Sequence, residues 1–179
     1  RNPEAIRWVR ERGAELVTNV SDGTRAAIRA LVEVAQREGR HPHQTARELR
    51  EVIGLTERQA GAVQHFRERL AADGVEDVAI ERRAGRYADV QLRARAANIA
   101  RTETLESSNA GQQSIWESAK AQGYLNPETT RRVWIAAPYD PPHYCQDDLD
   151  QAEVGLDEPW HADGREIMRP PAHPQCRCS

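Results

Sequence analysis

Apolar residues recur every three or four positions over much of the chain, which is the spacing of amphipathic helices. The run Asn2-Pro3-Glu4 combines a cap, an early proline and a first-turn acid, and it predicts a helix that extends toward Leu16. Three further helices are expected between residues 22 and 72, and Thr56 with Gln59 forms the capping box of the last one. Their short connections predict one compact helical unit.

A longer helical pattern occupies residues 81–122. Its first apolar stripe contains Leu92, Ala96, Ile99 and Ala100, and its second contains Ile115, Trp116 and Ala119. Gly111 lies between the two stripes. Because glycine costs about 1 kcal/mol in a helix interior, Gly111 is expected to interrupt or bend this helix.

The pattern changes after Gly123. Residues 131–136 predict a short strand and residues 154–156 a second one, while the remainder is rich in Pro, Asp and Gly and is expected to be irregular. The sequence therefore predicts an α+β fold that is predominantly helical, with a long central helix and a small β or irregular C-terminal segment. We expect an N-terminal helical region over residues 1–80 and a second domain over residues 81–179.

Charge is distributed unevenly along the chain. The formal net charge is −3, which argues against strong non-specific nucleic-acid binding by the surface as a whole. Residues 1–110 carry 19 basic and 17 acidic side chains (+2), whereas residues 111–179 carry 6 and 11 (−5). Basic runs on helices are more often solvated faces than nucleic-acid sites. The candidates for a nucleic-acid contact are Arg82, Arg83, Arg86, Arg93 and Arg95.

Charged residues also interrupt the middle of the long helix, in the run Arg101-Thr102-Glu103. Arg101 and Glu103 lie about 200° apart around a helix, so they cannot face each other. We expect one of them to pair with the C-terminal segment, because buried charges need partners. The alternative is a catalytic Glu103, as in a sugar- or phosphate-transferring enzyme, although no Gly-rich phosphate loop accompanies it.

Three cysteines and two histidines cluster near the end of the chain. They are His143, Cys145, His173, Cys176 and Cys178. Thiolates and imidazoles are natural zinc ligands, and a metal could replace the apolar core that this segment lacks. The candidate zinc ligands are Cys145, His173, Cys176 and Cys178. Buried thiols without a metal, and a disulfide from Cys145 to one of the other two cysteines, are the alternatives.

Several of these segments together carry a family resemblance. They are Ala100-Arg101-Thr102-Glu103-Thr104, Asn109-Ala110-Gly111, Trp116, Trp134, Asp140, Leu156-Asp157-Glu158-Pro159-Trp160 and the closing Pro170-Pro171-Ala172-His173-Pro174-Gln175-Cys176-Arg177-Cys178. With these residues the chain resembles the phage Mu F-like minor head proteins, also called phage head morphogenesis proteins, most strongly over residues 85–179. Family members often have a C-x-x-C before the Leu-Asp-Glu-Pro stretch. Here Asp148 stands where the second cysteine would be, which excludes a four-thiolate site.

The resemblance implies a structural virion protein, not an enzyme, that is present in few copies and needed for head assembly. It would assemble in the host cytoplasm and then lie in the capsid interior, in association with the portal protein, the major capsid or scaffolding protein and packaged DNA. No apolar stretch approaches the roughly 20 residues of a membrane span, so no membrane partner is expected. The motif residues with an expected structural role are Arg101, Thr102, Glu103, Trp116, Trp134, Asp140, Pro171 and His173.

Two other functions remain open at this stage. One is a virion-carried enzyme or effector that uses Glu103 and the Cys/His cluster. The other is a metal-bound module that contacts DNA through the arginines of residues 82–101.

Overall fold

The computed structural model describes residues 2–14, 17, 20–136, 153–162, 164–173, 176 and 178. This part of the chain forms five helices and four short strands. The helices are α1 (Pro3–Arg12), α2 (Asp22–Glu38), α3 (Pro42–Leu49), α4 (Glu57–Ala72) and α5 (Asp77–Ala121). The strands are β1 (Arg131–Val133), β2 (Glu153–Gly155), β3 (Trp160–Ala162) and β4 (Arg165–Ile167).

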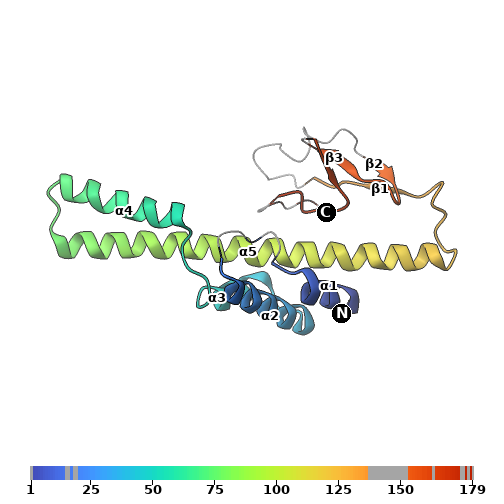
Figure 1. The fold of residues 1–179 in the computed structure, drawn as a ribbon, viewed down its shortest axis with the longest axis horizontal. Helices are drawn as coiled ribbons and strands as arrows, with labels where there is room; N and C mark the ends of the chain where they lie inside the picture. The colour runs from blue at the N-terminus through green and yellow to red at the C-terminus, as the bar shows by residue number, and fades with distance from the viewer. Residues whose placement is uncertain are drawn as a thin grey trace.

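Helix α5 runs along the whole length of the molecule (Figure 1). Helix α4 folds back along one end of it, α1 to α3 lie on one side of its middle, and the strands lie on the opposite side. The predicted α+β fold with a long central helix and a small C-terminal β segment is therefore confirmed. The expected boundary at residue 80 falls in the first turn of α5, and helices α1 to α4 of the N-terminal region pack on that helix. None of the described helices combines the length and the apolar character that crossing a membrane requires.

The helix starts follow from the cap residues of the sequence. The Asn2 side chain accepts a hydrogen bond from the amide of Glu4 at 3.0 Å, with Pro3 at the first helical position. Thr56 and Gln59 form the predicted capping box at the start of α4, because each side chain bonds to the backbone of the other. These local signals placed the starts of the helices correctly.

The end of α1 differs from the prediction. The helix stops at Arg12, well before Leu16, and Ala14 adopts a positive φ of 64°. Gly13 is packed so tightly that a Cβ there would lie 2.5 Å from the carbonyl oxygen of Val9. The chain therefore leaves the helix at Gly13, in a turn that tertiary contacts hold in place.

The prediction that Gly111 interrupts the long helix is wrong, because α5 is continuous over 45 residues. Gly111 has a different role there. A Cβ at this position would lie 2.9 Å from the backbone nitrogen of Ala5 and 2.5 Å from the side-chain nitrogen of Asn2. The missing side chain thus lets α1 pack directly against the backbone of α5.

The main core lies between α5 and the first three helices. Ile28, Val32 and Leu49 are essentially inaccessible to solvent and contact the first apolar stripe of α5 at Ala96, Ile99 and Ala100. Each such aliphatic side chain stabilises the fold by about 1.5–3 kcal/mol relative to an exposed one. The second expected stripe is only partly buried, since Ile115 is exposed.

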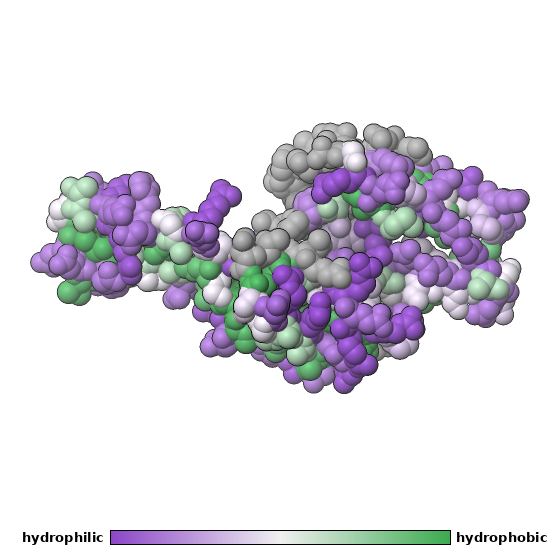
Figure 2. All heavy atoms as spheres, viewed as in Figure 1, coloured by the Kyte–Doolittle hydropathy of each residue, from purple (hydrophilic) through white to green (hydrophobic). Residues whose placement is uncertain are grey.

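Helix α4 and the start of α5 form an arm that extends beyond this core (Figure 1). Val63, Leu70, Ile80 and Ala84 are buried in it, and the ring centroids of Phe66 and Tyr87 lie 5.2 Å apart. The viewed face of the arm mixes polar and apolar side chains (Figure 2).

The C-terminal segment contains two antiparallel strand pairs. In the first, Arg132 of β1 lies opposite Val154 of β2, which confirms both predicted strands approximately. The second pair, β3 with β4, was not predicted, and in it Trp160 lies opposite Ile167. A small second core forms around Trp134, Val154, Trp160, Cys176 and Cys178.

We predict that Gly111→Ala destabilises the protein relative to Gly85→Ala, its matched control in the same helix. An added Cβ at Gly85 meets nothing within 4 Å, so that variant should gain helix propensity of about 1 kcal/mol. At Gly111 the same gain is opposed by overpacking against α1, which commonly costs about 1–3 kcal/mol. Denaturant unfolding of both variants measures the difference, and equal stabilities would contradict the close contact with α1.

Candidate functional site

Glu103 is the charged side chain of the predicted motif that lies deepest in the fold. None of its surface is exposed, and its Oε2 accepts a hydrogen bond from the backbone amide of Ala14 at 2.5 Å. Thr102, next to it, is also buried, whereas Arg101 is half-buried and makes no hydrogen bond or ion pair among the described residues. A carboxylate that accepts a backbone amide in a dry environment makes a strong, charge-assisted contact.

The turn that Glu103 holds is fixed from a second side by α2. Arg25 donates to the carbonyl oxygens of Ala14 at 2.6 Å and Val17 at 3.0 Å, and Arg29 donates to that of Gly13 at 2.5 Å. The amide and the carbonyl of Ala14 are thus both bound by charged side chains. Arg101 or Glu103 was expected to pair with the C-terminal segment, and the contact of Glu103 with Ala14 fixes the N-terminal segment. The pairing with the C-terminal segment stays a prediction.

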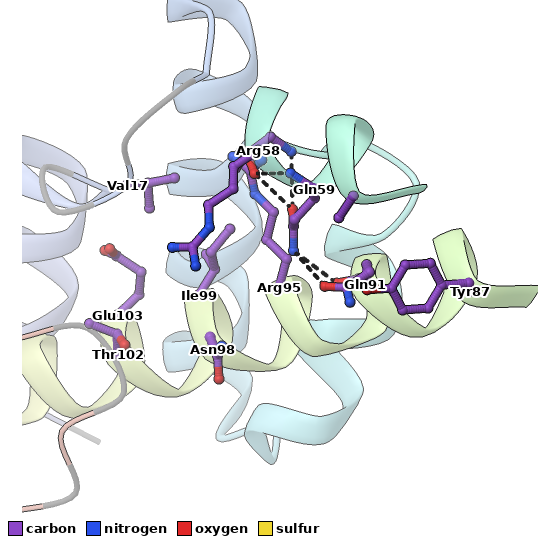
Figure 3. Close-up of a pocket in the computed structure, with 12 residues that line it drawn as sticks. Val17, Arg58, Gln59, Tyr87, Gln91, Arg95, Asn98, Ile99, Thr102 and Glu103 are labelled. Carbon is purple, nitrogen blue, oxygen red and sulfur yellow. Dashed lines mark hydrogen bonds between the residues drawn. The ribbon is translucent and has the colours of Figure 1, made fainter. Parts of the chain in front are cut away.

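Glu103 also contributes to the wall of a pocket of about 500 Å³. The pocket lies between the first turn of α4, the middle of α5 and the turn at Val17 (Figure 3). Its polar lining includes Arg58, Gln59 and Arg95, and Gln59 reaches across to the backbone oxygen of Gln91 at 3.4 Å. Although Glu103 forms part of the wall, its lack of solvent exposure separates its carboxylate from the open space.

A second polar centre, which the sequence reading missed, is Arg132 on β1. Its guanidinium donates to the carbonyl oxygens of Gly155 at 3.3 Å, of Met168 at 2.6 Å and of Glu158. It also lies over the ring of Trp160, 4.5 Å from the centroid. Burial lowers the pKa of Arg132 from its ordinary value, because the charged form loses hydration.

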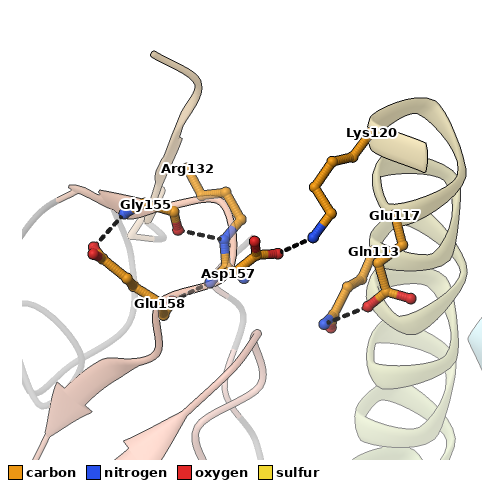
Figure 4. A network of polar contacts seen from close by, with 7 residues as sticks. All are labelled: Gln113, Glu117, Lys120, Arg132, Gly155, Asp157 and Glu158. Atoms are coloured by element: carbon orange, nitrogen blue, oxygen red, sulfur yellow. Dashed lines mark hydrogen bonds and ion pairs between the residues drawn. The ribbon is translucent and has the colours of Figure 1, made fainter. Parts of the chain in front are cut away.

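The neighbouring contacts join this centre to α5 (Figure 4). Lys120 pairs with Asp157 at 2.6 Å, and the Glu158 carboxylate accepts the amide of Gly155 at 2.8 Å. A Cβ at Gly155 would lie 2.8 Å from that carboxylate, so a larger residue there would require the Glu158 side chain to shift. Arg132 and Lys120 therefore connect the strands to one another and to the helix.

Two amide side chains earlier on α5 contact residues 169 and 170. The Asn109 side chain donates to the carbonyl oxygen of Pro170 at 3.0 Å, and Arg169 donates to the Gln113 side chain at 3.1 Å. Arg169 also lies over the ring of Trp8 in α1, at 5.8 Å. The resemblance segments around Asn109 and Pro170 thus meet in space although 61 positions separate them.

The remaining motif residues lie around these contacts. Trp134 is buried against Trp160, with ring centroids 5.2 Å apart, and Pro171 is buried. Trp116 and His173 are half-buried. Asp140 lies outside the described residues.

The described residues of the proposed zinc site do not form a complete ligand set. Cys176 and Cys178 are both buried in the second core, and the amide of Cys176 donates to the carbonyl oxygen of His173 at 3.1 Å. No group of three or more His, Cys, Asp or Glu side chains suited to a metal occurs within the described ranges. Cys145, His143 and Asp148 lie outside them. Zinc therefore stays a prediction, which elemental analysis with thiol counting would check.

The five arginines proposed for nucleic-acid binding do not share one environment. Arg82, Arg83, Arg86 and Arg93 are exposed on the arm. Arg95 is only 8 % exposed and lines the pocket, and burial lowers its pKa. The structure thus separates Arg95 from the exposed set, because α4 packs over this part of α5.

In comparisons with known proteins, no family model, curated protein or solved structure matched the chain.

We predict that Glu103→Ala lowers the free energy of unfolding and frees the amide of Ala14 for hydrogen exchange. An unsatisfied buried amide costs about 1–3 kcal/mol of stability, and the cavity left by the missing side chain lowers the stability further. Glu103→Gln should lose less, since the amide oxygen can still accept from Ala14. Glu117→Ala, an exposed position on the same helix, is the control and should change stability by less than about 0.5 kcal/mol. Unchanged exchange at Ala14 in the Glu103→Ala variant would argue against the contact.

Arg132→Lys is expected to loosen the strands while the helices stay folded. Lysine cannot reproduce the planar fork that reaches three carbonyl oxygens, and losing such contacts should cost the C-terminal segment roughly 3 kcal/mol. The control is Arg131→Lys, at the adjacent exposed position of β1. Limited proteolysis followed by mass spectrometry measures the effect, which should appear as cleavage beyond residue 122 in the first variant only. Equal cleavage of both variants would exclude a central role for Arg132.

Proposed function

We propose that this protein is a minor head component of a tailed bacteriophage, with a structural role in head assembly. The observation that carries the proposal is the hydrogen bond from Asn109 to the carbonyl of Pro170, which joins the Asn109-Ala110-Gly111 segment of the family resemblance to its specific C-terminal ending. In the proposal these segments are parts of one structural unit, in which the long helix presents side chains that hold the Pro-Pro-x-His-Pro-x-Cys-Arg-Cys ending in place.

The chemistry of the motif residues supports a structural role. Glu103 bonds to a backbone amide, Arg132 bonds to backbone carbonyls, and Trp134 packs in the second core. Groups engaged in this way position the chain and are not poised to react with a substrate. The proposal therefore places function in the binding surfaces of the protein, and not in a reaction.

The partners in this proposal are the portal protein and the major capsid or scaffolding protein, in the capsid interior near packaged DNA. Two exposed apolar residues, at the end of β1 and just beyond it, support protein contacts of this kind. Val133 is 57 % exposed and Ile135, two positions later, is 63 % exposed. Exposed apolar side chains that lie close together in the chain suit a protein interface better than contact with water.

An enzyme carried in the virion is the second candidate, and one observation favours it. Glu103 lies in the wall of the pocket of about 500 Å³, together with Arg58 and Arg95. Against it stands the full burial of Glu103 and its bond to Ala14, which leave the carboxylate no exposed surface for a substrate. The structural proposal explains this burial directly, and the enzymatic one does not.

A deletion phage complemented in trans tests both candidates. Without the protein we expect defective heads and a large loss of titre, which the wild-type chain should restore. Complementation with Glu103→Gln then separates the two functions, because glutamine keeps an acceptor for the Ala14 amide but cannot act as a catalytic carboxylate. Near-wild-type titre with Glu103→Gln supports the structural role. Normal heads from the deletion phage would contradict the assignment, and failure of Glu103→Gln with normal stability would favour the enzyme.

A further inference from the structure

The pocket between α4 and α5 has the size and the mixed lining of a ligand site. Its volume of about 500 Å³ falls within the range of small-molecule pockets, about 300–1,000 Å³. Val17, Ala62 and Ile99 supply apolar wall, and Tyr87 adds an aromatic ring. The polar groups on the wall include the cationic side chains of Arg58 and Arg95, the side-chain amides of Gln59 and Asn98, and the buried carboxylate of Glu103.

Two arginines from facing helices give one part of this pocket a positive charge. Arg58 points from the first turn of α4 into the open space (Figure 3), and within the described part of the chain it makes no hydrogen bond or ion pair. Arg95 lies on α5 with 8 % of its surface exposed, so its guanidinium is largely removed from water. Charges interact more strongly in such a site than in bulk solvent.

The negative charge of the pocket lies away from Arg95. Glu103 follows Arg95 by eight positions on the same straight helix, which places their backbones about 12 Å apart along its axis. The Glu103 carboxylate is engaged by the amide of Ala14. Arg95 and Glu103 therefore occupy different parts of the pocket wall.

We propose that this pocket binds a small organic oxyanion. A carboxylate or phosphate group would lie at the Arg58 and Arg95 end, because a guanidinium presents paired donors that match two oxygens of either group. The side-chain amide of Asn98 offers a further donor, and the apolar wall accommodates the carbon body of the ligand. This site does not depend on the proposed function in head assembly.

Calorimetric titration of the full chain with three probes tests the site. Phenylacetate and phenyl phosphate carry the two kinds of oxyanion on an aromatic body, and 2-phenylethanol is their neutral counterpart. At least one anion should bind with a Kd below about 10 mM, and the alcohol at least tenfold more weakly. Comparison of the two anions shows whether the site takes a carboxylate or a phosphate.

Arg58→Gln is the decisive variant, because Arg58 is exposed and holds no described part of the fold together. It should weaken anion binding at least tenfold, the usual consequence of losing a charge-assisted pair. Arg82→Gln, an exposed arginine on α5 that does not line the pocket, should leave binding unchanged. Binding of neither anion, equal binding of the alcohol, or equal affinity in the Arg58→Gln variant and the wild type would overturn the proposal.

Discussion

The other helices pack on α5, so their positions depend on α5 being continuous. Its 45 residues span about 68 Å at 1.5 Å per residue, which is too long for any single neighbour to cover. Helix α4 covers its start, and α1 and α3 cover its middle. Two positions in its C-terminal third show how closely these contacts are combined. Gly111 admits the backbone of α1, while Asn109, about 200° away around the helix, binds the carbonyl of Pro170. One turn of α5 therefore joins the beginning and the end of the described chain.

The sequence predicted the features that depend on neighbouring residues. The Asn2 cap and the Thr56–Gln59 capping box mark real helix starts, because both ends of each interaction lie within three positions. Gly111 shows where such reasoning fails. Glycine does have an intrinsic cost in a helix. The contact that compensates for it comes from Ala5, more than a hundred positions earlier, and no local sequence pattern indicates that contact.

In the candidate site too, the sequence revealed local signals but not the distant partners of the residues. Glu103 stands out in the sequence as a charge in a helix middle, yet its partner Ala14 lies 89 positions away and presents only a backbone amide. In the sequence Arg95 is one of a group of basic residues. It is buried because α4 packs over this part of α5. For Arg132 a usable signal was present. Strand residues alternate between faces, so Arg132 shares a face with Trp134, and the burial of that tryptophan implies a buried arginine beside it.

The choice of arginine at position 132 follows from what the C-terminal segment lacks. Its strands are three residues long and its core contains few apolar side chains, so burial alone stabilises it weakly. Three carbonyl groups, from Gly155, Glu158 and Met168, turn toward the same point, and each needs a donor if it is to leave water. Only a guanidinium carries enough donors in one rigid plane to satisfy all three while its face lies over Trp160. The desolvation that lowers the pKa of Arg132 opposes this arrangement, but the carbonyl oxygens and the indole ring replace much of the lost hydration. A buried cation thus orders a segment that has too little apolar material to order itself.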